Sequence, residues 1–176
     1  YPALSSILED YFNQLHVWWN LDASWIRRQY PMNQAPEHHH PHSWHQDGAL
    51  GFDFLARKSD APLRMLTCWI TLDECGKLAP GIEYVSDPSH ASRLLTLNEL
   101  QASAIDQGFP PRARNRPELS GGDCLLMTGG LLHRTHQSHD MTRHRTSLEI
   151  RFFGSPPALL KEHQFINIGH HTGLDS

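Results

Sequence analysis

The sequence predicts a mainly β protein, a sandwich or barrel with α-helices on its outside. Most of the chain consists of short apolar or alternating runs bounded by Pro and Gly, a pattern typical of such folds rather than of strands that alternate with helices. The last of these runs has one polar and one apolar face. Candidate metal ligands lie far apart in the sequence, and a sheet that closes on itself can bring such residues together.

The first element is expected to be an amphipathic helix over residues 4–19. Its apolar residues recur at helical spacing, and Ser6 with Glu9 fits a capping box. The apolar stripe consists of Leu4, Ile7, Leu8, Tyr11, Phe12, Leu15 and either Trp18 or Trp19. We expect this helix to lie on the outside of a sheet.

Candidate strands follow at residues 25–30, 43–56, 63–72, 82–85, 123–128, 131–135 and 145–153. The other helical candidate is 94–107, whose best-formed part is expected to start near Asn98 and Glu99. Residues 108–117, rich in Pro and Arg, are expected to form a surface connection.

No repeat or linker divides the chain, so residues 1–176 are expected to form a single domain. Because Tyr1 is not an initiator methionine, the sequence leaves open a missing N-terminal segment.

The strand at 145–153 has two distinct faces. One face carries Arg145, Ser147, Glu149 and Arg151, and the other carries Leu148, Ile150 and Phe152. Polar groups directed into a barrel and apolar groups directed toward a covering helix would produce this alternation. An exposed edge strand would look the same locally, but the metal-ligand pattern described below favours the barrel interior.

Composition and charge exclude several classes of function. The formal net charge of -4 arises from interspersed acids and bases without a basic stripe, so we expect a small-molecule partner and no nucleic acid. No apolar run approaches the roughly 20 residues that span a bilayer, and no signal-peptide pattern begins the chain, so no membrane association is expected. The three cysteines, Cys68, Cys75 and Cys124, form no Cys-x-x-Cys pair, which is consistent with a reducing cytoplasm. We expect all three to pack as small apolar residues in the core. The oligomeric state is not indicated.

A metal site is predicted by His45-Gln46-Asp47 together with the distant His133. In a strand, residues i and i+2 point to the same side, so His45 and Asp47 can bind one ion while Gln46 faces elsewhere. Two histidines and one carboxylate hold one face of a non-haem Fe(II) and leave three positions open. An arginine after the distal histidine, Arg145, strengthens this pattern.

Other histidines leave alternatives open. His136, His139 and His144 lie near His133, but the Gly-x-Leu-x-His context favours His133, with His136 as the substitute. The chain contains 14 histidines, four of them in Glu37-His38-His39-His40-Pro41-His42. This histidine-rich loop is expected to be solvated or to line the entrance of the site. A second, adventitious metal site is the alternative.

The same residues resemble the phytanoyl-CoA dioxygenase family of Fe(II)- and 2-oxoglutarate-dependent oxygenases, over residues 44–153. Three segments carry the resemblance in order: Trp44-His45-Gln46-Asp47-Gly48, residues 66–90, and residues 122–133. The middle segment contains Cys68-Trp69-Ile70 in a strand, an acidic turn, Ala79-Pro80-Gly81 and Pro88-Ser89-His90. It departs from the family pattern because Asp87-Pro88-Ser89-His90 lacks a glycine.

The resemblance implies a double-stranded β-helix with flanking helices, a jelly-roll barrel of the cupin type. It implies that His45, Asp47 and His133 bind Fe(II), and that Arg145 pairs with the distal carboxylate of 2-oxoglutarate through its planar, permanently charged fork. Further residues are implied at the cosubstrate: Ser147 as a second hydrogen-bond donor, Thr135 and Gln46 nearby, and Trp69 as a pocket wall. Arg143 is the competing candidate for the arginine that binds 2-oxoglutarate, because the family usually separates the distal histidine and this arginine by about one residue less.

The implied reaction uses dioxygen to decarboxylate 2-oxoglutarate to succinate and CO2 and to hydroxylate or otherwise oxidise a small organic molecule. Related halogenases have a small residue in place of the carboxylate, so Asp47 favours oxidation over halogenation. One alternative is a cupin-like metalloprotein whose chemistry does not require 2-oxoglutarate. The other is a non-catalytic binding or sensing module on the same barrel. Nothing in the sequence identifies the substrate.

Overall fold

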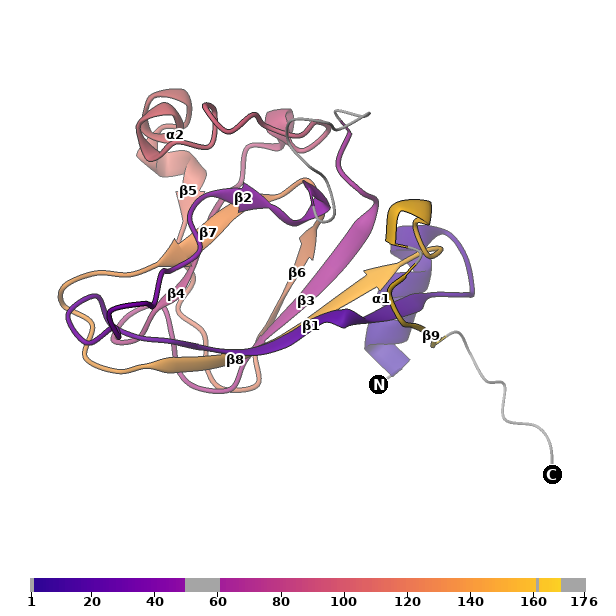
Figure 1. The fold of residues 1–176 in the computed structure, drawn as a ribbon, viewed down its shortest axis with the longest axis horizontal. Helices are drawn as coiled ribbons and strands as arrows, with labels where there is room; N and C mark the ends of the chain where they lie inside the picture. The colour runs from indigo at the N-terminus through magenta and orange to yellow at the C-terminus, as the bar shows by residue number, and fades with distance from the viewer. Residues whose placement is uncertain (1, 50–60, 161, 169–176) are drawn as a thin grey trace.

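The computed structural model describes residues 2–49, 61–160 and 162–168, and the strands in these ranges form two antiparallel sheets (Figure 1). One sheet has the strand order β6-β3-β8-β1-β9 and the other has the order β2-β7-β4-β5. With two α-helices outside the sheets, this arrangement is a double-stranded β-helix and confirms the predicted fold class. No helix in the described ranges is long and apolar enough to cross a membrane.

The five-stranded sheet consists of β1 (Trp18–Gln29), β3 (Met65–Thr71), β6 (Cys124–Thr128), β8 (Arg145–Phe153) and β9 (Phe165–Asn167). The four-stranded sheet consists of β2 (His45–Gln46), β4 (Gly81–Val85), β5 (Arg114–Asn115) and β7 (Leu132–His136). The helices are α1 (Pro2–Phe12) and α2 (Ala102–Gly108), and the single 3-10 turns are η1 (Asp47–Ala49), η2 (Pro88–His90), η3 (Pro111–Ala113) and η4 (Ala158–Leu160).

Most predicted strands are present, and β8 has the predicted bounds. The observed strands differ from the predicted ones in three respects. The strand expected at 25–30 begins earlier, at Trp18, and the strand expected at 43–56 is reduced to β2 and η1, with residues 50–60 outside the described ranges. The short strands β5 and β9 were not expected, because they are too short to show an alternation of polar and apolar residues. They form by backbone pairing with β4 and β1, respectively.

The N-terminal helix is shorter than predicted. Asn13 follows it with a φ of 55°, a left-handed conformation that ends a helix and that asparagine tolerates better than most residues. Trp18 and Trp19 therefore belong to β1, where they pair with β8, and the prediction that they extend the helical stripe is wrong. Ser6 lies inside α1 and cannot cap its start, so the predicted capping box is also wrong.

Helix α1 covers the outer face of the five-stranded sheet, as predicted. Leu8 and Phe12 are buried against Leu66, Cys68 and Phe152, which come from β3 and β8. This apolar cluster confirms the outer-face assignment for β8. The polar face of β8 therefore points between the two sheets.

Helix α2 covers the other sheet and is also shorter than predicted. Glu99 accepts a hydrogen bond from the Thr96 backbone N–H (2.8 Å), which closes a separate turn, and Gln101 is extended with ψ 140°, so the helix begins only at Ala102. Ile105 of α2 packs with Val85 and other residues of the four-stranded sheet. Figure 1 shows α2 beside β5 and away from α1.

The cysteines do not all behave as predicted. All three are free thiols, and Cys68 and Cys75 are buried. Cys124 is exposed at the start of β6, so the prediction that it packs as a core residue is wrong. The physical reason is its position at the strand end, where the apolar layer stops.

Candidate metal centre

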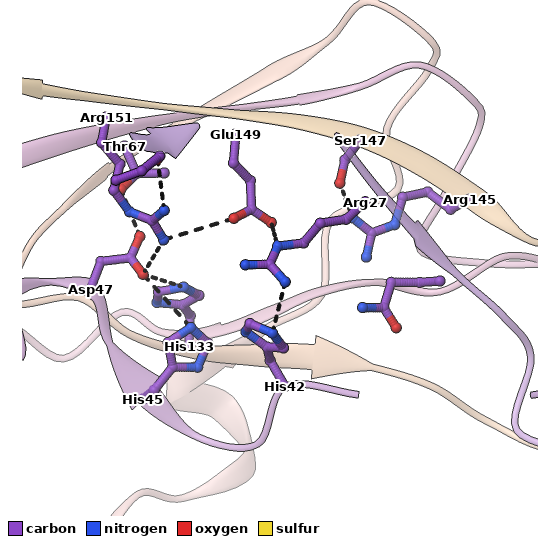
Figure 2. Close-up of polar contacts among 12 residues, drawn as sticks. Arg27, His42, His45, Asp47, Thr67, His133, Arg145, Ser147, Glu149 and Arg151 are labelled. Atoms are coloured by element: carbon purple, nitrogen blue, oxygen red, sulfur yellow. Dashed lines mark hydrogen bonds and ion pairs between the residues drawn. The ribbon is translucent and has the colours of Figure 1, made fainter. Parts of the chain in front are cut away.

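Three potential ligands converge between the sheets. His45 lies on β2, Asp47 begins η1 and His133 lies on β7, and one ligand atom from each lies within 4.8 Å of the others. The Nε2 atoms of His45 and His133 lie 3.7 and 4.0 Å from Asp47 Oδ1. Figure 2 shows the three side chains directed toward one another. The sequence pattern therefore identified a group that the fold brings together.

Strand pairing and a close backbone contact produce this convergence. His45 pairs directly with His133 across β2 and β7. Gly48 N–H donates to Gly129 O at 2.7 Å, and a Cβ on Gly48 would lie 2.7 Å from that same oxygen. Because any larger residue would push these segments apart, glycine is required here. Asp47 is in a 3-10 turn rather than in the predicted strand, so the turn, and not strand alternation, directs its carboxylate.

Both histidines are oriented by hydrogen bonds to main-chain carbonyls. His45 Nδ1 lies 2.7 Å from Ser43 O, and His133 Nδ1 lies 3.0 Å from Leu131 O. A carbonyl accepts, so each Nδ1 carries the proton and each Nε2 presents a lone pair to the centre. Burial, assisted by the neighbouring His133, lowers the pKa of His45 to about 4, which keeps this ring neutral near pH 7.

Asp47 is held as an anion by two buried partners. Thr67 Oγ1 donates to its Oδ2 at 2.6 Å, and Arg151 Nη2 lies 3.0 Å from its Oδ1. Burial by itself raises the pKa of Asp47, but His133, Arg151 and His45 outweigh it and hold the pKa well below its usual range. The Asp47 carboxylate is therefore ionised, and Oδ1, its oxygen nearest the histidines, is held in place.

Arg151 was placed on the interior face by the sequence pattern but was not assigned to the site. Its side chain is buried, Nη1 donates to Ala23 O at 3.0 Å, and its guanidinium lies over the Trp25 ring at 4.4 Å. Alternation along β8 gave its direction. Its partner Asp47 belongs to a distant turn, so no local signal could have identified the ion pair.

Replacing Arg151 with methionine should destabilise the metal-free protein by about 3–5 kcal/mol, because Asp47 would then be a buried charge without its cation. A divalent ion at the site would restore that compensation, so Mn(II) should stabilise the variant more than the wild type. Chemical denaturation with and without Mn(II) measures both effects. Arg143→Met is the matched control, because the Arg143 side chain forms a solvent-exposed pair with Glu74. An equal effect of Mn(II) on wild type and Arg151→Met would contradict the argument.

A small cavity opens beside the three ligands, which form part of its lining. Arg145, Trp69 and Thr135, three of the residues expected at the cosubstrate, line it. Arg145 is 2% exposed, and its guanidinium lies 4.7 Å from the centre of the Trp69 ring. Within the described ranges Arg145 forms no ion pair with an acidic residue, and burial lowers its pKa to about 10, so it remains charged near pH 7. A buried cation without a counter-charge suits an anionic ligand.

Two residues expected near the cosubstrate form hydrogen bonds with other parts of the protein and do not line the cavity. Ser147 is not part of the cavity lining, and its hydroxyl accepts a hydrogen bond from Arg145 Nη1 at 2.7 Å, so it holds the arginine. Gln46 lies outside the lining as well, and its side-chain amide donates to Arg93 O and Gly130 O, both at 2.9 Å. Gln46 therefore anchors the loop after β4, which corrects its expected place near the cosubstrate.

The structure also separates the competing candidates. Arg143 is largely exposed and pairs with Glu74 outside the cavity. His136, His139 and His144 are absent from both the ligand group and the cavity lining. The geometry therefore favours Arg145 and His133, the residues preferred from the sequence.

Several cavity residues were not among the predicted metal or cosubstrate residues. They are Arg27, Gln29, His42, Thr67, Ile82, Met127, Arg134 and Glu149. His42 belongs to the histidine-rich loop, so part of this loop lines the site entrance, whereas His38 and His40 are not part of the cavity lining. Arg27 and Gln29 lie two residues apart on β1, and recognising them required the pairing of β1 with β8.

Comparison with known proteins gives structural neighbours. No protein-family model and no curated protein matches the sequence. Among solved structures, EctD from S. alaskensis in its apoform matches with a TM-score of 0.63 and 12% identity over 85% of this chain and 49% of that chain. AviO1 from Streptomyces viridochromogenes Tue57 matches with a TM-score of 0.57 and 19% identity over 88% of this chain and 59% of that chain. The non-haem α-ketoglutarate-dependent epimerase SnoN from nogalamycin biosynthesis matches with a TM-score of 0.55 and 14% identity over 87% of this chain and 53% of that chain.

EctD also matches in structures with bound Fe and with 2-oxoglutarate and 5-hydroxyectoine. The chain spans about half to three-fifths of the length of these neighbours. At such low identities the similarity establishes the fold. What the individual residues bind has to be argued from the site itself.

Proposed function

We propose that this chain is a single-domain non-haem Fe(II)- and 2-oxoglutarate-dependent oxygenase that oxidises a small organic molecule and is related to the phytanoyl-CoA dioxygenase family. One observation carries the proposal. The cluster of His45, Asp47 and His133 shares a cavity with Arg145, a buried arginine that has no acidic partner among the described residues. A metal site beside an unmatched cation is the combination that an anionic, metal-chelating cosubstrate requires.

The residues fit Fe(II). Two neutral imidazoles and one carboxylate are the donor set that binds this ion on one face and leaves the other positions open. The Nδ1 hydrogen bonds of the histidines and the contacts of Thr67 and Arg151 with Asp47 fix all three ligands before the metal arrives. Such preorganisation reduces the cost of ordering the site.

The residues also fit 2-oxoglutarate. Ser147 and the Pro80 carbonyl hold Arg145 in one orientation, so its remaining N–H groups can bind the distal carboxylate. Trp69 forms a wall against the guanidinium, and the Thr135 side chain is at the cavity surface. When bound, Fe(II) and 2-oxoglutarate would supply the oxidising chemistry, with succinate and CO2 as coproducts.

The structural neighbours support the same class but do not narrow the reaction. EctD binds Fe and 2-oxoglutarate, and SnoN is an epimerase that depends on α-ketoglutarate. Hydroxylation is the reaction that we propose first, because Asp47 keeps the carboxylate ligand in place. A cupin-like protein that does not bind 2-oxoglutarate would bury the charge of Arg145 without an anion to compensate its desolvation. A non-catalytic module would not require three preorganised metal ligands.

The proposal predicts that anaerobic addition of Fe(II) and then 2-oxoglutarate produces a weak visible charge-transfer band. Oxygen should then release succinate, and a screen of small organic molecules should identify those that accelerate this release. The control omits Fe(II) and should give no band and no succinate. Metal binding without any affinity for 2-oxoglutarate would support the cupin-like alternative, and binding of neither would support the non-catalytic module.

A further inference from the structure

A second arginine lies in the same cavity, nearer to its opening. Arg27 of β1 pairs in register with Ser147 of β8, so both side chains are on the interior face. The Arg27 side chain is 27% exposed, whereas Arg145 is 2% exposed. We propose that Arg27 binds a carboxylate group of the substrate, which makes the substrate class small organic monocarboxylates. This inference rests on the proposed oxygenase function.

Arg27 is held in place but is not fully satisfied. Its guanidinium lies over the Trp25 ring at 4.8 Å, and Nη1 lies 3.1 Å from His42 Nε2. Nε is 3.0 Å from Glu149 Oε1, yet this buried N–H has no hydrogen-bond partner among the described residues, so the contact with Glu149 is an ion pair only. A planar guanidinium fixed against an aromatic ring with donors to spare is a preorganised carboxylate receptor.

The charges of the cavity indicate the charge of the ligand. A series of ionic contacts joins Arg27, Glu149, Arg151 and Asp47, in which two cations balance two anions (Figure 2). Arg145 adds one unbalanced positive charge. A divalent metal and the 2-oxoglutarate dianion would cancel each other, so the loaded site keeps this excess of one. A carboxylate monoanion would offset this excess.

Two neighbouring groups do not remove this positive excess. Arg134 also lines the cavity, and its Nη2 is paired at 2.6 Å with Glu83, a carboxylate that also pairs with Arg116 at 2.9 Å. His42 accepts from Arg27 and counts as neutral, and a protonated His42 would only increase the positive excess. Both groups therefore leave the cavity attractive to an anion.

The position of Arg27 distinguishes its role from that of Arg145. Arg145 is the deeper of the two and is held by Pro80 and Ser147, as suits the cosubstrate. Arg27 contacts His42, whose ring is 5.3 Å from that of the metal ligand His45. A carboxylate at Arg27, replacing His42 as the acceptor from Nη1, would hold the rest of the molecule next to the metal centre. Binding energy at such a remote group orients the bond that reacts.

The test uses acetate through octanoate and the matching primary amides as probes, because each amide has the shape of its acid without the charge. Calorimetry with Mn(II) and saturating 2-oxoglutarate measures their affinities. Wild type should prefer the carboxylates by about tenfold or more, as expected for charge-assisted hydrogen bonds. Arg27→Gln should lose this preference, and Arg27→Lys should retain part of it. Arg28→Gln is the matched control, since Arg28 is the next residue and is exposed, and it should keep the full preference.

Three results would overturn the assignment: no carboxylate preference in wild type, an undiminished preference in Arg27→Gln, or a loss of 2-oxoglutarate affinity in Arg27→Gln as large as in an Arg145 variant. The last result would assign Arg27 to the cosubstrate. Wild-type affinities for Mn(II) and 2-oxoglutarate are measured first, without any probe. A failure of the proposed function is therefore seen in those titrations and is separate from a failure of the carboxylate preference.

Discussion

Replacing Asp47 and His133 together with alanine should abolish stoichiometric binding of Fe(II) and, with it, all turnover of 2-oxoglutarate. Among the described residues the site has three candidate protein ligands, and the variant keeps one of them, His45. A single imidazole binds such ions weakly. Metal content after anaerobic loading and desalting, together with succinate release, measures the loss.

The controls separate metal binding from folding. Asp47→Ala leaves the buried Arg151 without its nearest anion and with Glu149 at 3.7 Å, so this variant is expected to be less stable, and circular dichroism should establish that it is folded. His133→Ala alone avoids that problem and should still lose tight binding. His136→Ala is the matched control, because His136 lies on the same strand outside the cavity and should leave metal binding unchanged. Unchanged binding in the double variant would refute the ligand assignment.

Replacing Arg145 with alanine should weaken 2-oxoglutarate binding by two or more orders of magnitude. The loss of one partner of a buried charge pair costs on the order of 3–5 kcal/mol, and each 1.4 kcal/mol corresponds to about tenfold in Kd. Arg145→Lys should recover only part of the affinity, because an ammonium group cannot form the two-pronged contact of a guanidinium. Calorimetric titration of the Mn(II)-loaded protein with 2-oxoglutarate gives these values.

Arg143 provides the control for this prediction. It is a largely exposed arginine of the same charge, and Arg143→Ala should change the affinity for 2-oxoglutarate by less than about threefold, as expected for a surface pair. A larger effect at Arg143 than at Arg145 would show that the wrong arginine was assigned. Metal content should remain at the wild-type level in both variants, since neither residue is a ligand.

The predicted fold class depended on patterns that are local in the chain. Alternation along residues 145–153 correctly gave the face that meets α1 and the face that points between the sheets. The helix end could not be found in this way, because the apolar spacing continues past Phe12 while Asn13 turns the backbone out of the helix. Short strands such as β5 and β9 carry no pattern of their own, since they exist only through pairing with a neighbour.

Residue type and order were enough to predict which residues could bind a metal: two histidines and one carboxylate. How these residues are held and what surrounds them depends on the tertiary structure. It placed Arg151 on Asp47, turned Gln46 toward the loop after β4, gave Ser147 to Arg145 and brought Arg27 to the cavity opening. Strand alternation sets the direction of a side chain but does not determine which residue it contacts. Partners come from register and turns that join distant parts of the chain, and those depend on the packing of the whole barrel.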